Sequence, residues 1–290
     1  MARTEESIER LNSEEVELDE LFKFIVELGS LPLTRFFRGV KNRDQDSLVP
    51  SIGRYQKQMQ ELVGFQNAVG NFIASIQGKA TTQQLTLHEQ ILKTEQELLA
   101  EFEKNTFPFL KKKYLGGESN QIWELIAIAQ HHGLPTRLLD WTESPLVALF
   151  FSADDLKEKI DGAFYVLTNI NEISSEDLKN HPKLLSEVKI YRPFPYASRI
   201  SNQKGAFTVS VNPNLDLEND ILKTEENASS KPTRSPKINQ IRIPGKYKLD
   251  ILQWLDGLGI SRSTLFPDID GVAATTKFRV VDWYFREESP

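Results

Sequence analysis

The first part of the chain has the hydrophobic spacing of helices on either side of one short strand. Residues 5–29 carry acidic side chains at first and helically spaced apolar ones later, which predicts a helix, or two short ones, with a solvated acidic start. After the break at GSLP, the apolar and aromatic run at residues 36–40 predicts a strand, and residues 48–54 predict a loop. Residues 58–112 contain few helix breakers and many helix formers, so they predict two or three helices.

The central part of the chain predicts two buried helices that follow each other closely. Residues 120–131 (NQIWELIAIAQH) are apolar on most sides, and Asn120 can cap the helix that they form. The pair Ser144 and Pro145 matches an N-cap followed by proline at the first helical position, which predicts a helix over 145–156.

The remaining third of the chain alternates between strand and loop patterns. Strands are predicted at 163–170, 206–211 and 238–243, and residues 246–258 predict an amphipathic helix. The sequence SRSTLFPDIDGVAA then predicts a turn that leads into another short helix. Residues 212–237 are polar and proline-rich, which is typical of a mobile loop.

These elements predict an α+β fold with a mixed, mostly antiparallel sheet. Helices dominate the first half of the chain and strands the second. We expect an N-terminal helical segment at 1–30 and one domain over 31–290, in which 58–112 form a helical insertion and 212–237 the mobile loop.

Composition narrows the class of protein. The chain has 290 residues, is 39% hydrophobic and has no cysteine, which excludes disulfides, thiolate catalysis and Cys-ligated metal sites. No stretch is apolar enough for a membrane span, and the charged N-terminus does not match a signal peptide, so we expect a cytoplasmic protein. The net charge of −6 disfavours a surface that grips nucleic acid as a whole, although one basic cleft stays open as an alternative.

Four polar positions within apolar segments are candidates for chemistry. Arg38 is either an outward-facing strand residue or an anion-binding group that Gly39 lets a phosphate approach. His131 and His132 end an apolar helix, so at most one of them caps it while the other faces the TRLLDW segment. Adjacent histidines do not share a helix face, so no metal site is expected.

The other two candidates also have a plain structural alternative. Asp140 lies in the apolar run LLDWT and needs a partner, which either Arg137 or a backbone turn would supply. Gln203 lies in a segment, ISNQKGAF, that reads as a loop entering a strand. The sequence contains no Walker A motif, dinucleotide-binding glycine pattern, nucleophile elbow or kinase signature.

Five segments together resemble the FRG domain family, named for its Phe-Arg-Gly signature. They are FFRG at 36–39, LVPSIGR at 48–54, AQHHGLPTRLLDWTESPLVALFFSA at 129–153, QKGAF at 203–207 and LFPDIDGVA at 265–273. The resemblance spans roughly residues 30–275, and its central block is long and specific.

A more distant resemblance to ADP-ribosyltransferases implies that the sheet is of the ADP-ribosyltransferase-like type, and it also implies a mechanism. Those enzymes hold NAD with an Arg or His on the first strand, have a Ser/Thr-bearing strand that leads into a helix, and carry a Glu or Gln on a later strand. Arg38, the pair Thr142 and Ser144, and Gln203 follow that order here. The usual catalytic Glu has no counterpart in QKGAF, so its role would pass to Asp140 or Glu143, or be absent.

The resemblance implies an enzyme that cleaves NAD, without a metal, and transfers ADP-ribose to a macromolecule, as a toxin or an antiviral defence effector. The acceptor would be RNA or protein, an antitoxin or other neutralising protein would be a further partner, and no membrane is involved. The alternative is a non-catalytic module that binds nucleic acid or protein in such a system. The implied catalytic residues are Arg38, His132, Asp140 and Gln203, and the implied NAD-binding residues are Phe37, Arg38, Gly39, His131, Arg137, Trp141, Thr142 and Ser144.

The candidate residues each lie beside a glycine or at the end of an element within an otherwise apolar segment, which gives a geometric prediction. Arg38, one of the two histidines, Asp140 and Gln203 should converge on one cleft, although they are far apart in the sequence.

Overall fold

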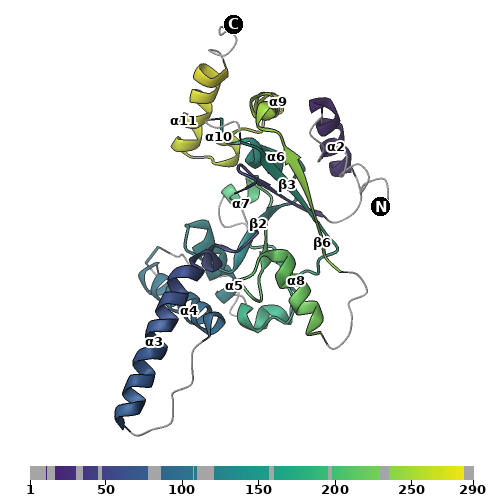
Figure 1. Ribbon diagram of the computed structural model, residues 1–290. Coiled ribbons are helices and arrows are strands. Elements are labelled where there is room, and N and C mark those ends of the chain that lie inside the picture. The colour runs from purple at the N-terminus through teal and green to yellow at the C-terminus, as the bar shows by residue number, and fades with distance from the viewer. Residues whose placement is uncertain are drawn as a thin grey trace.

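An antiparallel sheet is the centre of this fold (Figure 1). The computed structural model describes residues 11, 17–30, 35–44, 48–77, 86–106, 108–109, 121–156, 160–194, 198–228 and 235–283. The six strands lie in the order β4-β5-β2-β1-β3-β6, and each neighbouring pair is antiparallel. Their bounds are β1 Arg35–Val40, β2 Leu138–Thr142, β3 Gly162–Thr168, β4 Lys189–Tyr191, β5 Gly205–Val209 and β6 Lys237–Ile243.

The α+β class is confirmed, and the sheet is more regular than expected. In the described residues, its parallel component is an isolated bridge between Glu172, which lies outside the named strands, and Ile190 of β4. The predicted strands at 36–40, 163–170, 206–211 and 238–243 correspond to β1, β3, β5 and β6.

The helices are distributed along the whole chain. Their bounds are α2 Leu18–Ser30, α3 Gln56–Gln77, α4 Leu87–Thr106, α5 Gln121–His131, α6 Pro145–Ala153, α7 Ser198–Asn202, α8 Leu217–Glu226, α9 Lys248–Gly257, α10 Arg262–Leu265 and α11 Ile269–Lys277, followed by a π-helical turn at Phe278–Trp283. Short 3₁₀ helices lie at Ser51–Tyr55, Asp177–Lys179, Pro182–Leu184 and Gly245–Tyr247. Helix α3 extends away from the rest of the molecule, with α4 beside it (Figure 1).

The sheet consists of two halves that meet at a narrow junction. Strands β1 and β3 pair along their whole length, from Arg35 to Val40, and β2 and β5 do so from Leu138 to Thr142. Between β1 and β2, by contrast, the register contains the single pair Phe37 and Thr142. The strands therefore diverge beside this pair, which leaves room for side chains at the middle of the sheet.

Two groups of helices cover the same face of the sheet, one over each half. Directly opposed residues and alternate residues of a strand point to one face, so Phe37, Thr142, Asp140 and Phe207 share a face. Phe37 belongs to the core under α2, α6 and α9, whereas Phe207 belongs to the core under α4 and α5. The gap between these two groups lies over the junction of β1 and β2.

The opposite face is covered in part by α8, where the sequence predicts a mobile loop. Leu217 and Ile221 of α8 are buried in a core that also contains Trp141 and Tyr165. The Asp220 carboxylate accepts hydrogen bonds from Ser210 Oγ and from the main-chain nitrogens of residues 211 and 212, which anchors the helix. The prediction of a loop is therefore wrong for 217–226, while 229–234 lie outside the described residues.

Close packing of α6 on β1 explains the glycine of the FFRG segment. A Cβ on Gly39 would lie 1.8 Å from the carbonyl oxygen of Ala148 and 2.6 Å from the nitrogen of Ser152. Ser144 occupies the N-cap of α6 and Pro145 follows at its start, as predicted, but the Ser144 side chain makes no capping bond. The predicted cap Asn120 and most of residues 1–16 lie outside the described part of the chain.

Candidate functional site

A pocket of about 300 Å³ lies at the junction between the two halves of the sheet. Side chains and backbone from β1, β2, β5, the end of α5, α6 and the α7–β5 segment form its wall. The lining residues are Phe37, Arg38, Gly39, Gln130, His131, Asp140, Trp141, Thr142, Phe151, Ile200, Gln203, Gly205, Ala206 and Phe207. Arg38, His131, Asp140 and Gln203 therefore converge on one cleft, as the sequence predicts.

Arg38 crosses the junction between the two central strands. Its Nη1 donates a hydrogen bond to the main-chain carbonyl of Asp140 at 2.8 Å, and its side chain is half-buried. The guanidinium is thus held next to the Asp140 residue by a backbone contact, which leaves the carboxylate of Asp140 to other partners. A planar guanidinium in a partly enclosed wall is suited to bind a phosphate or carboxylate with two hydrogen bonds.

A chain of hydrogen bonds fixes the Asp140 carboxylate. Gln130 Nε2 donates to Asp140 Oδ2 at 2.9 Å, and Gln130 Oε1 accepts from Thr136 Oγ1 at 2.7 Å. Thr136 Oγ1 in turn accepts from the Leu138 main-chain nitrogen at 3.1 Å, so its own proton points to Gln130. The side-chain amide nitrogen of Gln130 therefore faces Asp140, and Asp140 Oδ2 accepts its hydrogen bond.

The two histidines occupy different environments. His131 is half-buried and lines the pocket, whereas His132 is exposed and does not line it. Their rings meet edge to face, with centroids 5.0 Å apart. The catalytic histidine was predicted to be His132. The placement of the two rings favours His131 for that role instead.

Gln203 is anchored at the rim. Its side-chain Nε2 donates to the main-chain carbonyl of Leu265 at 3.2 Å, and the main-chain carbonyl of Gln203 accepts from Thr142 Oγ1 at 2.6 Å. The Thr142 hydroxyl also accepts a hydrogen bond from the Ser144 main-chain nitrogen at 3.0 Å. Thr142 thus connects β2, the start of α6 and the α7–β5 segment, and Ser144 lies outside the pocket wall.

Arg137 was predicted to bind NAD, but it is buried and is not among the residues that line the pocket. Its side chain and that of Glu95 on α4 are each 1% exposed and form a buried ion pair. Arg137 Nε lies 2.8 Å from Glu95 Oε2, and the main-chain nitrogen of Arg137 donates to Glu95 Oε1 at 3.0 Å. Arg137 is thus a structural residue that does not line the pocket, and Gln130 is the partner of Asp140 in its stead.

Phe37, Gly39 and Trp141, three of the predicted NAD-binding residues, line the pocket, and each also has a structural role. The position of a Cβ on Gly39 is filled by the backbone of α6, so close helix packing accounts for this glycine. Trp141 places its ring in the core of the opposite face, where its Nε1 donates to Thr208 Oγ1 at 3.1 Å. The Phe37 ring lies in the core under α6, 5.7 Å from the ring of Phe164.

Some pocket residues were missed by the sequence analysis. The sequence does not predict Gln130 as a site residue, because it precedes the more conspicuous histidine pair at the end of an apolar helix. Phe151 and Phe207 line the pocket as well, and they read from the sequence as ordinary core positions. Only the position of Gln130 at the end of a helix, next to a predicted site residue, hinted at its role.

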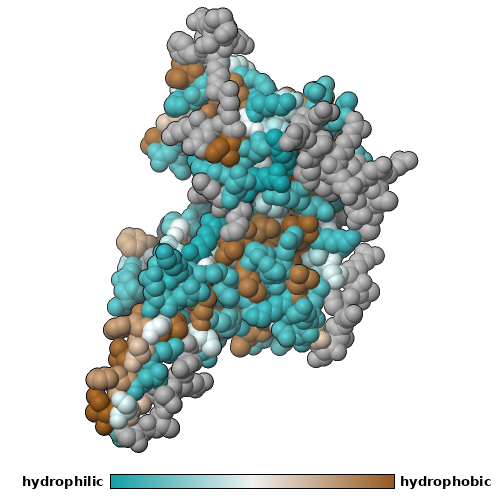
Figure 2. All heavy atoms as spheres, in the orientation of Figure 1, coloured by the Kyte–Doolittle hydropathy of each residue, from teal (hydrophilic) through white to brown (hydrophobic). Residues whose placement is uncertain are grey.

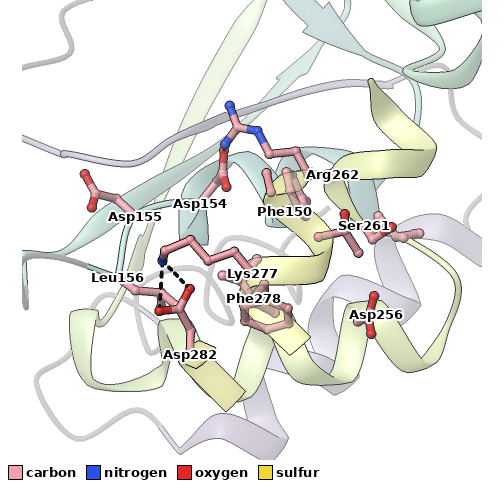
Figure 3. Close-up of a pocket in the computed structure, with 14 residues that line it drawn as sticks. Phe150, Asp154, Asp155, Leu156, Asp256, Ser261, Arg262, Lys277, Phe278 and Asp282 are labelled. Carbon is pink, nitrogen blue, oxygen red and sulfur yellow. Dashed lines mark hydrogen bonds and ion pairs between the residues drawn. The ribbon is translucent and has the colours of Figure 1, made fainter. Parts of the chain in front are cut away.

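A second pocket, of about 320 Å³, lies between the end of α6 and helices α9 to α11 (Figure 3). Its four aspartates each have a cationic partner. The pairs are Asp154 with Arg262, Asp155 with Lys41, Asp256 with Arg279 and Asp282 with Lys277. Burial raises the pKa of the Asp154 carboxyl, and Arg262 opposes that shift. Because the chain itself balances these charges, the first pocket is the stronger candidate for a site.

Two features of the described residues bear on the class of protein. They contain no group of three or more His, Asp or Glu side chains placed to hold a metal ion. None of the helices seen in the described segments is long and apolar enough to cross a membrane.

Comparison with models of known protein families gave a match for part of the chain. Residues 34–160 match the family model of the FRG domain, which confirms the predicted resemblance for this part of the chain. The match includes Arg38, Gln130, His131 and Asp140, and it ends before Gln203. Searches of curated proteins and of solved structures gave no match to this chain.

Proposed function

We propose that the pocket at the junction of β1 and β2 binds NAD and cleaves its bond between nicotinamide and ribose, with transfer of ADP-ribose to a macromolecule. One observation carries the proposal. Arg38, Thr142 and Gln203, which follow the order of the ADP-ribosyltransferase pattern along the chain, meet in a single cavity with His131 and Asp140.

Each side chain has a role that its contacts support. Arg38, held at the Asp140 carbonyl, would bind the diphosphate with two hydrogen bonds. The aromatic rings of Phe151 and Phe207 would cover the flat rings of the ligand, in place of Phe37 and Trp141. A cavity of about 300 Å³ is at the small end for ligand sites, so it would enclose the reacting end of NAD and leave the rest near the rim.

Asp140 would stabilise the positive charge that develops on the ribose as the nicotinamide leaves. A carboxylate held in place by Gln130 needs little reorganisation when that charge appears, which is the favourable case for electrostatic catalysis. The acceptor nucleophile would then bond to the ribose carbon and lose its proton, with His131 as the base within the pocket wall. Glu143, the other acid considered, is paired with Arg192 and lies outside the pocket wall.

In this proposal the acceptor is protein or RNA. An acidic chain favours a protein acceptor over duplex DNA. An enzyme that modifies cellular macromolecules in this way would act as a toxin or a defence effector, and a neutralising protein would restrain it.

The test is an incubation of the purified protein with NAD and a cell extract. We expect release of nicotinamide and an added ADP-ribose on a macromolecule, both detected by mass spectrometry. His131→Ala should lower the rate strongly and His132→Ala should leave it nearly unchanged, because only His131 lines the pocket. Binding of NAD without release of nicotinamide would contradict the enzyme and favour a binding module. Equal losses in the two histidine variants would contradict the assignment of His131.

A further inference from the structure

Helix α3 carries a continuous apolar stripe on its solvent side. The stripe consists of Leu62, Phe65, Val69, Phe72 and Ile76, whose spacing alternates between three and four residues. Phe65, Phe72 and Ile76 are 68%, 66% and 69% exposed. Hydrophobic side chains gather along this protruding helix in Figure 2, at the position of α3 in Figure 1. Apolar residues with this spacing are typical of the seam between the helices of a left-handed coiled coil.

The rest of the described chain does not account for this stripe. The inward side of α3 is where Met59 joins Ile52 and Ile91 in a small core, and Ala74 is the other buried residue of the helix. The large apolar side chains of α3 thus point away from the body of the molecule.

Helix α3 also has little stability of its own. Gly64 and Gly70 lie in its interior, and each glycine costs about 1 kcal/mol relative to alanine in a helix. Several β-branched residues lower its helix propensity further. A helix of this composition needs contacts on its apolar face to stay formed, because packing supplies most of the stability of helices in proteins.

The charges on α3 indicate which partner fits. Lys57 and Glu61 are its charged residues, and both precede the stripe, so residues 62–77 carry none. A helix that lies on a membrane surface is typically rich in Lys and Arg on its polar face, which α3 is not. Charges beside a coiled-coil seam select partners and exclude others, and none here opposes the pairing of two identical helices.

The exposed apolar area is enough for a pair of helices. From the exposed fractions of the stripe and of the neighbouring Ile73, we estimate roughly 600 Å² of apolar surface on one copy. Two copies would then bury roughly 1,200 Å², which is the lower limit of specific protein–protein interfaces.

We propose that this stripe is a self-association surface, on which α3 of one copy packs against α3 of a second copy about a twofold axis. In such an interface the same patch is used on both copies. Val69, at the middle of the stripe, lies next to the axis and meets its own counterpart. The proposal concerns a surface outside the pocket and is independent of the reaction there.

Sedimentation velocity over a range of concentrations is the test of this surface. The wild-type chain should be dimeric at micromolar concentration. The double variant Phe65→Glu/Phe72→Glu places like charges in the seam and should weaken the dimer by more than about 100-fold. Gln60→Glu, which adds the same kind of charge on the same helix outside the stripe, is the matched control and should remain dimeric. A wild-type monomer at all concentrations, or a dimer that the double variant leaves intact, would overturn the proposal.

A crosslinking experiment does not depend on the stability of the glutamate variants. Because the chain has no cysteine, Val69→Cys introduces a single thiol, which should form a disulfide-linked dimer on mild oxidation. Gln60→Cys should not crosslink at the same protein concentration. Absence of the Val69→Cys crosslink, or flotation of the wild-type chain with phospholipid vesicles as a monomer, would argue against the second copy.

Discussion

The buried ion pair between Glu95 and Arg137 gives the sharpest test of how the pocket is supported. It connects α4, in the predicted helical insertion, with the residue just before β2, the strand that carries Asp140. We expect that Glu95→Gln, which keeps the shape of the side chain and removes its charge, destabilises the whole domain.

The magnitude follows from the contacts of the carboxylate. Its two oxygens accept from Arg137 Nε at 3.1 and 2.8 Å, from Arg137 Nη2 and from the Arg137 main-chain nitrogen at 3.0 Å. The guanidinium cannot lose its proton, so without Glu95 it stays charged in the interior. Breaking one side of a buried pair costs about 3–5 kcal/mol, a large share of the 5–15 kcal/mol by which domains are typically stable.

Urea unfolding, followed by tryptophan fluorescence, measures this loss. The control is Glu97→Gln, two residues further along the same helix, where the carboxylate is exposed and lies 3.9 Å from Lys93. That change should alter the free energy of unfolding by less than about 1 kcal/mol, because exposed pairs contribute little.

Replacing both partners gives an independent check. The double variant Glu95→Leu/Arg137→Met removes the buried charges together and should recover most of the stability lost by Glu95→Gln. The reasoning is refuted if Glu95→Gln and Glu97→Gln have equal effects, or if the double variant is less stable than the single one.

Three other outcomes are expected. Gly39→Ala should lower the free energy of unfolding by about 1–3 kcal/mol or more, because its Cβ would collide with the backbone of α6. Gly205→Ala should be nearly neutral, since its Cβ would have no atom closer than 3.7 Å. Equal melting temperatures of the two variants would contradict this expectation. Burial raises the pKa of the Glu124 carboxyl, despite hydrogen bonds from Tyr191 Oη and the Phe194 nitrogen. The contribution of this group to stability is therefore present at low pH and is lost as pH rises through the raised pKa, so the stability of Glu124→Gln relative to wild type should increase with pH above about 4.5. A stability difference that does not change with pH would count against this expectation. Arg38→Ala and Asp140→Asn should each remove most NAD turnover with little loss of stability. Arg38→Lys should retain little turnover, because lysine lacks the planar guanidinium. Turnover of Asp140→Asn within a few-fold of wild type would assign Asp140 a structural role.

The hydrophobic pattern predicted most of the long helices and four of the six strands, but it missed β2 and α8. The amphipathic helix α9 and the strands β1, β3, β5 and β6 were predicted from it. The run LLDWT was not predicted as a strand, because it is short and the charged Asp140 interrupts its apolar residues, although four of its five residues are buried. Helix α8 was hidden in a polar segment, although Leu217 and Ile221 have helical spacing and Asp216 caps it.

The sequence predicted the site residues as polar positions within apolar segments, but it did not predict the contacts that hold them. The convergence of Arg38, Asp140 and Gln203 could not be derived from spacing, since these residues come from three separate strands or strand ends. The role of Gln130 could not be predicted either, because Ser51 and Thr136, which border its carbonyl, meet only through the tertiary fold. Arg137 was misassigned for the same reason, since its partner Glu95 lies 42 residues away.

The helical insertion, which contains α3 and α4, has two sides with different surroundings. At its base, Met59 of α3 packs with Ile91 of α4, and α4 holds Arg137, three residues before Asp140. At its outer side, the apolar stripe of α3 faces solvent. Substitutions in the stripe leave the contacts of Met59 and Glu95 in place. Loss of self-association should therefore not disturb the pocket, whereas loss of Glu95 should weaken the pocket and the base of the insertion together.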